Sequence, residues 1–128
     1  LLDDGFSLDD IREAEIRLTV DGPDGYRLEG ASAMNQISRD PADLVAATIG
    51  ANHQYPDGMV LYLGTMFAPV DDRDEKGQGF THKVGDIVTI ATAKLGRLSN
   101  AVVYSSDAEP WTFGTGALMR NLAGRGLL

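Results

Sequence analysis

The sequence predicts a predominantly β domain of the α+β class, with two short helices. Residues 11–20 place apolar side chains at alternate positions, which is typical of a strand with one solvent-exposed face. Later apolar runs are separated by clusters of Gly, Pro, Asp and Asn, which punctuate β structure. Because the chain has 128 residues, its length corresponds to one domain.

The first quarter of the chain is expected to form a β-hairpin. Residues 1–10 are acidic and small, as in a leading loop or a single turn. The strand at 11–20 is followed by turn-forming residues at 21–25, and residues 26–32 have the length and composition to pair back.

Two helices are expected, one after the hairpin and one near residue 120. For the first, Asp40 is a good N-cap, Pro41 suits the first helical position, and Gly50 marks the end. The second is a short terminal helix in the stretch 115–126, with Leu118, Met119 and Leu122 on one face and Gly126 after it. Trp111 precedes it and either lines a pocket or packs against this helix, and we favour the packing role.

Residues 59–69 are expected to contain a central strand buried on both faces. The run is almost entirely apolar and follows a Pro-Asp-Gly turn. Gly64 then allows a ligand or another backbone to come close, and Thr65 presents a hydroxyl at the end of the strand. The alternative is that Gly64 and Thr65 only bend the strand.

The remaining elements are a loop and two further strands. Residues 70–79 are so polar that we expect a surface loop that contributes nothing to the core. Strands are expected at 87–91 and 101–104, with a turn at 95–98, which brings the number of strands to at least five.

Composition excludes several classes of function. The net charge of −8, with only 11 Lys and Arg, argues against binding to nucleic acid or to an anionic membrane. There is no cysteine and no apolar run near the roughly 20 residues of a membrane-spanning helix. A cytoplasmic location is therefore expected. Since the chain starts Leu1-Leu2-Asp3-Asp4 without Met, we expect a segment of a longer polypeptide.

Few residues suggest chemistry by type and spacing. The two histidines, His53 and His82, lack the spacing of metal ligands. The acidic cluster at 71–75 has carboxylates suited to Mg²⁺ or Ca²⁺ but lacks the spacing of an EF-hand loop, so a solvated loop is favoured. No serine-nucleophile motif is present.

The order of motifs resembles the C-terminal part of the catalytic domain of the fumarylacetoacetate hydrolase superfamily. The resemblance covers about residues 10–104. It rests on Gly30-Ala31-Ser32 near the end of the hairpin, on Leu63-Gly64-Thr65, on Val84-Gly85-Asp86-Ile87-Val88, and on Leu95-Gly96-Arg97-Leu98-Ser99-Asn100.

The resemblance implies a rolled, mixed β-sheet and a divalent cation: Mg²⁺, Mn²⁺ or Ca²⁺. In the family, a Glu-x-Glu, a later Asp and a catalytic lysine precede the region that this chain resembles. Glu13 and Glu15 have the first spacing but lie in the hairpin, so the role is not transferred to them. Residues 1–128 are then the C-terminal portion of one catalytic domain, with the metal-binding portion expected upstream of residue 1 and the catalytic residues outside this chain.

Within the family, residues 35–41, 64–69 and 111–114 are similar to the branch that dehydrates 2-keto-3-deoxy sugar acids. That resemblance implies loss of a C3 proton to give a metal-stabilised enolate, followed by loss of the C4 hydroxyl. Five residues are then candidates for binding the 2-keto acid. Thr65 would hold the carboxylate end, Gly64 would permit its approach, and Ser32, Arg39 and His53 would contact hydroxyls.

Two other functions stay open. One is a hydrolase of the same family that cleaves a carbon–carbon bond in an acylpyruvate or diketo acid. The other is a non-catalytic β scaffold, in which the acidic surface only maintains solubility. The resemblance also implies a homo-oligomer.

Overall fold

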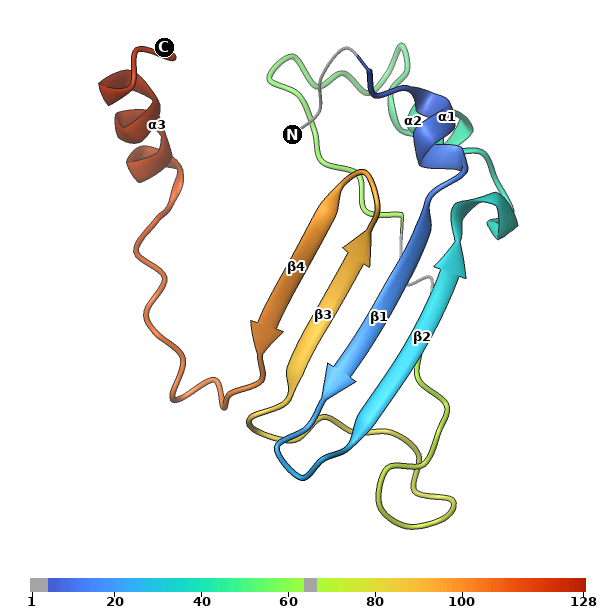
Figure 1. Ribbon diagram of the computed structural model, residues 1–128. Helices are drawn as coiled ribbons and strands as arrows, with labels where there is room; N and C mark the ends of the chain where they lie inside the picture. Colours follow the sequence, from blue (N-terminus) through green and yellow to red (C-terminus); the bar gives the residue numbers. More distant parts are fainter. Residues whose placement is uncertain (1–4, 64–66) are drawn as a thin grey trace.

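The protein is an α+β structure built on one antiparallel sheet (Figure 1). The computed structural model describes residues 5–63 and 67–128. The α+β class is therefore confirmed, with one more α-helix in this part of the chain than the sequence predicted. In chain order the elements are α1 (Leu8–Arg12), β1 (Glu15–Asp21), β2 (Arg27–Ala33), the 3-10 helix η1 (Met34–Gln36), α2 (Pro41–Thr48), β3 (Ile87–Thr92), β4 (Gly96–Ala101) and α3 (Thr115–Gly124).

The sheet contains two hairpins side by side, in the order β2-β1-β3-β4 (Figure 1). All three pairings are antiparallel, whereas the sequence led us to expect a mixed sheet. The hairpin of β1 and β2 is confirmed. Its turn is closed by a hydrogen bond of 2.8 Å from the N–H of Gly22 to the carbonyl of Tyr26, and Gly25 has a φ of +82°, which only glycine adopts readily.

One face of the sheet is apolar, but only its β1–β2 half is buried. Val20 lies between Leu28 and Val88 in the register, and it is fully buried, as Leu28 nearly is. In the next row, Leu18 lies beside Ile90, which pairs with Leu98. The exposed fractions are 48% for Ile90 and 66% for Leu98. The core therefore ends in the middle of the sheet.

The prediction that the first strand begins at residue 11 was wrong by four residues. The hydroxyl of Ser7 accepts from the N–H of Asp10, whose carboxylate accepts from the N–H of Ser7 at 2.7 Å. This reciprocal capping box starts the short helix α1, and the alternation of the strand takes over only at Glu15.

The prediction of a helix after Asp40 is confirmed. Its carboxylate accepts from the N–H of Ala42 at 2.8 Å, and Pro41 lies in the first turn of α2. Arg12 of α1 also donates to the Asp40 carboxylate, at 2.6 Å. The N-cap of α2 is therefore tied to α1, and the two helices lie together at one end of the sheet (Figure 1).

The expected central strand at 59–69 is not found in the residues that the structure describes there. Residues 59–63 and 67–69 have no regular secondary structure, and Val60 and Tyr62 are 79% and 87% exposed. Leu61 and Leu63 instead line an apolar cavity of about 390 Å³ beside α1 and α2. A strand needs a hydrogen-bonding neighbour as well as apolar side chains, and the four strands of the sheet pair without this segment.

The prediction of a strand that begins at Ile87 is confirmed by β3, but the second strand of this hairpin begins earlier than predicted. Residues 93–95 form its turn, Gly96 has a φ of +90°, and β4 runs from there to Ala101. The expected strand at 101–104 was therefore wrong, because β4 ends at Ala101. The N–H of Val102 donates to the carbonyl of Asp86, and its carbonyl accepts from the N–H of Gly85. Because no strand is found at 59–63 or 67–69, the described residues contain four strands rather than at least five.

The helix near residue 120 is confirmed as α3, but it does not pack on the sheet. An extended segment at 102–114 leads away from β4, and α3 stands apart from the other elements (Figure 1). Trp111 is 88% exposed, and its Nε1 donates to the carbonyl of Phe113 at 2.8 Å. The expected packing of Trp111 against the helix was therefore wrong. No helix in the described ranges has the length and hydropathy to cross a membrane.

Candidate functional site

Phe67 packs directly on the sheet. A β-carbon added at Gly30 of β2 would lie 2.3 Å from Cε1 of Phe67, which is far inside van der Waals contact. Gly30 is therefore glycine because the Phe67 ring occupies the space of a side chain. Ser32 lies two residues further along β2, on the same face of the sheet as Gly30.

A buried ion pair between Arg73 and Asp86 fixes the chain that follows Phe67. The side chains are 1% and 0% exposed. The Nη2 of Arg73 donates to Oδ1 of Asp86 at 2.7 Å, and Nη1 donates to Oδ2. The pairing is thus bidentate. The prediction that residues 70–79 contribute nothing to the interior was wrong at Arg73, because a guanidinium that is paired with a carboxylate through both Nη atoms can be buried where a solitary one cannot. The buried Nε of Arg73 has no hydrogen-bond partner among the described residues.

Neighbouring groups complete this cluster. The guanidinium of Arg73 lies 4.4 Å from the ring centroid of Tyr26, a cation–π contact with the first hairpin. The N–H of Lys83 donates to Asp86 at 2.8 Å, and His82 Nδ1 lies 3.6 Å from the same carboxylate. The Arg73 hydrogen bonds, opposed by burial and helped by the Lys83 N–H, hold the pKa of Asp86 far below its usual range. Asp86 therefore remains ionised.

The acidic loop uses its carboxylates to close itself. Asp72 accepts from the N–H of Gly77 at 2.7 Å and from that of Gly79 at 2.6 Å, and these two hydrogen bonds lower its pKa. Asp74 pairs with Lys83, which also lies 3.4 Å from Asp24. These contacts join the loop to the hairpin turn and to the residues before β3.

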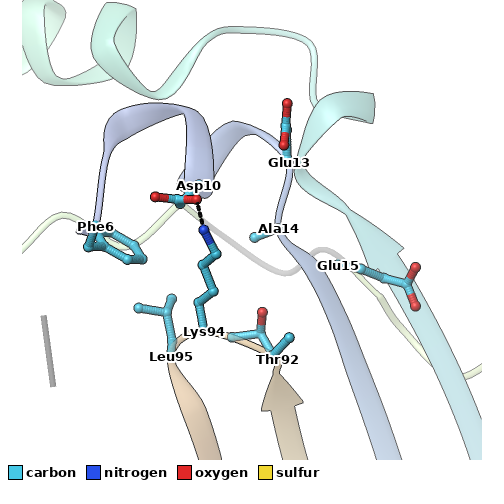
Figure 2. Close-up of a pocket in the computed structure, with 9 residues that line it drawn as sticks. Phe6, Asp10, Glu13, Ala14, Glu15, Thr92, Lys94 and Leu95 are labelled. Carbon is cyan, nitrogen blue, oxygen red and sulfur yellow. Dashed lines mark hydrogen bonds and ion pairs between the residues drawn. The ribbon is translucent and has the colours of Figure 1, made fainter.

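A small cavity of about 260 Å³ lies where α1 meets the turn between β3 and β4 (Figure 2). Lys94 extends from the turn toward Asp10 of α1 and pairs with its carboxylate. This hydrogen bond and that from the Ser7 N–H lower the Asp10 pKa to about 2. The carboxylates of Glu13 and Glu15 extend away from Lys94 (Figure 2).

The candidate binding residues are only partly described. Gly64 and Thr65 lie outside the described residues. Ser32 is half-buried in β2 beside Ile16. Arg39 is exposed, lies before α2, and donates to the carbonyl of Asp43 at 3.5 Å. His53 is exposed in a turn after α2, where its backbone pairs with Gly50. These three residues therefore come from separate elements.

The described residues do not fit the divalent cation that the resemblance implies. No group of three or more His, Cys, Asp or Glu is arranged to hold a metal ion within residues 5–63 and 67–128. Asp10 is paired with Lys94, and Asp72 accepts from backbone N–H groups. A carboxylate that already accepts hydrogen bonds from a lysine or from backbone N–H groups is a poor ligand for a hard cation.

Sequence reasoning did not identify Arg73 and Asp86 as a buried ion pair. Arg73 is the only basic residue in the run from Asp71 to Glu75, and Asp86 follows Gly85 directly before β3. Each position carried a signal, since a single base among acids and a Gly-Asp turn both suggest a specific partner. Neither signal identified the residue with which Arg73 or Asp86 pairs.

No protein-family model, curated protein or solved structure matches the chain.

Proposed function

We propose that this chain belongs to a divalent-metal-dependent hydro-lyase that removes water from a 2-keto-3-deoxy sugar acid. In this proposal the four strands are part of the rolled, mixed sheet of the fumarylacetoacetate hydrolase superfamily. The chain supplies the wall of the site that holds the carboxylate end of the substrate. The metal ligands and the base belong to residues outside the described ranges.

The observation that carries the proposal is the packing of Phe67 on Gly30. Two of the motifs behind the resemblance, one around Gly30 and Ser32 and one ending at Thr65, are far apart in the sequence. Phe67 follows the second motif by two residues and contacts the first. This contact supports a single substrate-binding wall built from both motifs.

The buried Arg73–Asp86 pair adds to this support. It anchors the chain after Phe67 to the first hairpin and to the residues before β3. An anchor that joins the first hairpin to the residues before β3 is the support that a binding group needs to stay in position. The hydroxyl of Thr65 would then donate a hydrogen bond to the substrate carboxylate.

In the proposed reaction, the C3 proton leaves and its electron pair forms the C3–C4 double bond. The C4 hydroxyl departs with a proton as water. The residues of this chain hold and orient the substrate during these steps and exchange no proton with it. Orientation of this kind lowers the barrier by fixing the reacting groups in advance.

The test is turnover of 2-keto-3-deoxypentonates by the full-length protein with Mg²⁺, followed as loss of water by mass spectrometry. A T65A variant should lose most of kcat/KM, and T65S should retain it because the hydroxyl remains. The matched control T112A changes an exposed threonine of the extended segment. Cleavage of an acylpyruvate without dehydration would replace the lyase by the hydrolase. No turnover of either substrate, with no binding of pyruvate or oxalate, would indicate a scaffold.

A further inference from the structure

The face of the sheet opposite the core carries two arginines in one row. Arg17 of β1 pairs with Ala91 of β3, and Ala91 pairs with Arg97 of β4. Side chains alternate between the two faces of a strand, so this row lies on the face opposite to Leu18 and Ile90. Because Ala91 has only a methyl side chain, the two arginines lie on either side of a low floor.

This row lines a cavity of about 720 Å³ at the end of the sheet where β3 turns into β4. The backbones of Arg17 and Arg97 are two strand spacings apart, which is about 10 Å. Their side chains can therefore contact one bound group from opposite sides. Glu15 also lines the cavity and extends away from Lys94 (Figure 2). The volume is within the range of about 300–1,000 Å³ that is typical of sites for small molecules.

Both arginines have hydrogen-bond donors available for a ligand. The side chain of Arg17 is 72% exposed, and its Nη2 pairs with the carboxylate of Glu15. A guanidinium has five N–H donors, so this single contact holds Arg17 without saturating it. Arg97 is exposed and forms no ion pair or side-chain hydrogen bond with any residue that the structure describes.

The hairpin of β3 and β4 is basic although the chain as a whole is acidic. Residues 87–101 contain Lys94 and Arg97 and no acidic residue, whereas the net charge of the chain is −8. Lys94 is paired with Asp10. Arg97 is therefore the uncompensated cation of this hairpin, and its charge favours an anion in the cavity.

The number of donors favours a phosphate group over a carboxylate. One guanidinium matches both oxygens of a carboxylate in a planar, bidentate pairing, which leaves no oxygen for a second guanidinium in the same plane. A phosphate group has three strong acceptor oxygens that point in different directions. It can therefore accept hydrogen bonds from guanidinium groups on two sides.

We propose that Arg17 and Arg97 bind a phosphate group above Ala91. Each guanidinium donates to the phosphate oxygens from one side, and Glu15 holds Arg17 in place. The cavity also has room for the organic part of a phosphate ester. The site lies on the face of the sheet opposite to Gly30, so phosphate binding is independent of the proposed dehydration.

Isothermal titration calorimetry of the full-length protein with inorganic phosphate tests the proposal. The R17Q and R97Q variants should each weaken binding about tenfold or more, because each removes hydrogen bonds to a charged group. The A91I variant keeps both charges but fills the floor, and it should weaken binding as well. The control R120Q removes an exposed arginine of α3 and should change the affinity less than about twofold. Circular dichroism checks that each variant is folded.

A second titration, with glucose 6-phosphate, identifies the source of the phosphate group. Tighter binding of this ester than of inorganic phosphate indicates an organic phosphate, and equal or weaker binding indicates free phosphate. The proposal is overturned if the unmodified protein binds neither compound, or if acetate binds as tightly as phosphate. It is also overturned if R120Q weakens binding as much as R97Q does, or if A91I leaves the affinity unchanged.

Discussion

The two halves of the apolar sheet face have similar side chains and opposite exposure. Val20 and Leu28 in the β1–β2 half are 0% and 3% exposed, and Ile90 and Leu98 in the β3–β4 half are 48% and 66% exposed. The difference lies in what covers them. Phe67 packs on Gly30 in the first half, and the chain after it is anchored by the buried Arg73–Asp86 pair, whereas α3 stands away from the second half (Figure 1).

The burial of a strand residue in this sheet depends on the segment that covers it more than on the strand itself. The β3–β4 pair is as regular as the β1–β2 pair, but hydrogen bonding between strands does not remove apolar side chains from water. The covering segment has little secondary structure of its own. Its position therefore depends on the contacts of a few residues. Four predictions test what stabilises each half of the sheet.

The largest effect is expected from breaking the Arg73–Asp86 ion pair, which fixes the chain that follows Phe67. The R73A substitution leaves Asp86 as a buried, unpaired charge, and should lower the free energy of unfolding by about 3 to 5 kcal/mol. Urea denaturation measures this change. The control R97A removes an exposed arginine of β4 and should cost less than about 0.5 kcal/mol. Equal losses of stability in both variants would show that the Arg73–Asp86 pair does not hold the chain after Phe67 in position.

The second prediction compares the loss of a leucine side chain from each half of the sheet face. The L28A substitution creates a cavity in the core and should cost about 2 to 5 kcal/mol. The L98A substitution removes a side chain that is 66% exposed and should change the stability of the monomer by less than about 0.5 kcal/mol. Both are measured at low protein concentration. A large loss for L98A in a monomer would mean that the β3–β4 half is covered within one chain.

The third prediction tests the contact between Phe67 and Gly30 of β2. An added methyl group in G30A clashes with the Phe67 ring and should cost about 1 to 3 kcal/mol. Combining it with F67A should relieve part of this cost, which a double-mutant cycle detects. The control G50A adds a methyl group where no atom lies within 4 Å. Strict additivity of G30A and F67A would contradict the packing.

The smallest effect concerns the ion pair between Lys94 and Asp10, which links the open half to α1. The pKa of Asp10 falls from 3.8 to about 2 on folding. Below pH 3.8 the unfolded chain therefore binds this proton before the folded one does, so stability declines between those values. The D10N variant should show a shallower decline in urea titrations. The control D57N removes one exposed carboxylate, and identical profiles for D10N and D57N would contradict the prediction.

Local patterns in the sequence predicted the elements whose causes are local. The cap and first turn of α2 were predicted because Asp40 and Pro41 act on neighbouring backbone atoms. The β1–β2 hairpin was predicted because alternation and a Gly-rich turn both lie within one short stretch. The start of α1 was missed although its signal was local, because the alternation from Ile11 was given more weight than the Ser7–Asp10 capping box.

The candidate site was less accessible to sequence reasoning. Thr65 and Gly64 were selected from their position after an apolar run, and that selection stays a prediction. Asp86 was named only within the Val84–Val88 motif of the resemblance, and Arg73 was assigned to the surface, whereas the two form a buried pair. Each of these two residues is polar, and only the presence of the other makes its burial favourable. A pattern read along one chain does not contain that information.

The sequence by itself thus determined the secondary structure of α2, α3, β3 and the first hairpin, because capping, turn and alternation signals act over a few residues. Tertiary structure alone decided which apolar residues are buried. The run at 59–63 is among the most apolar of the chain, yet Val60 and Tyr62 are exposed, while the charged Arg73 is enclosed. Burial requires a complementary partner in space, and that partner is set by the packing of distant segments.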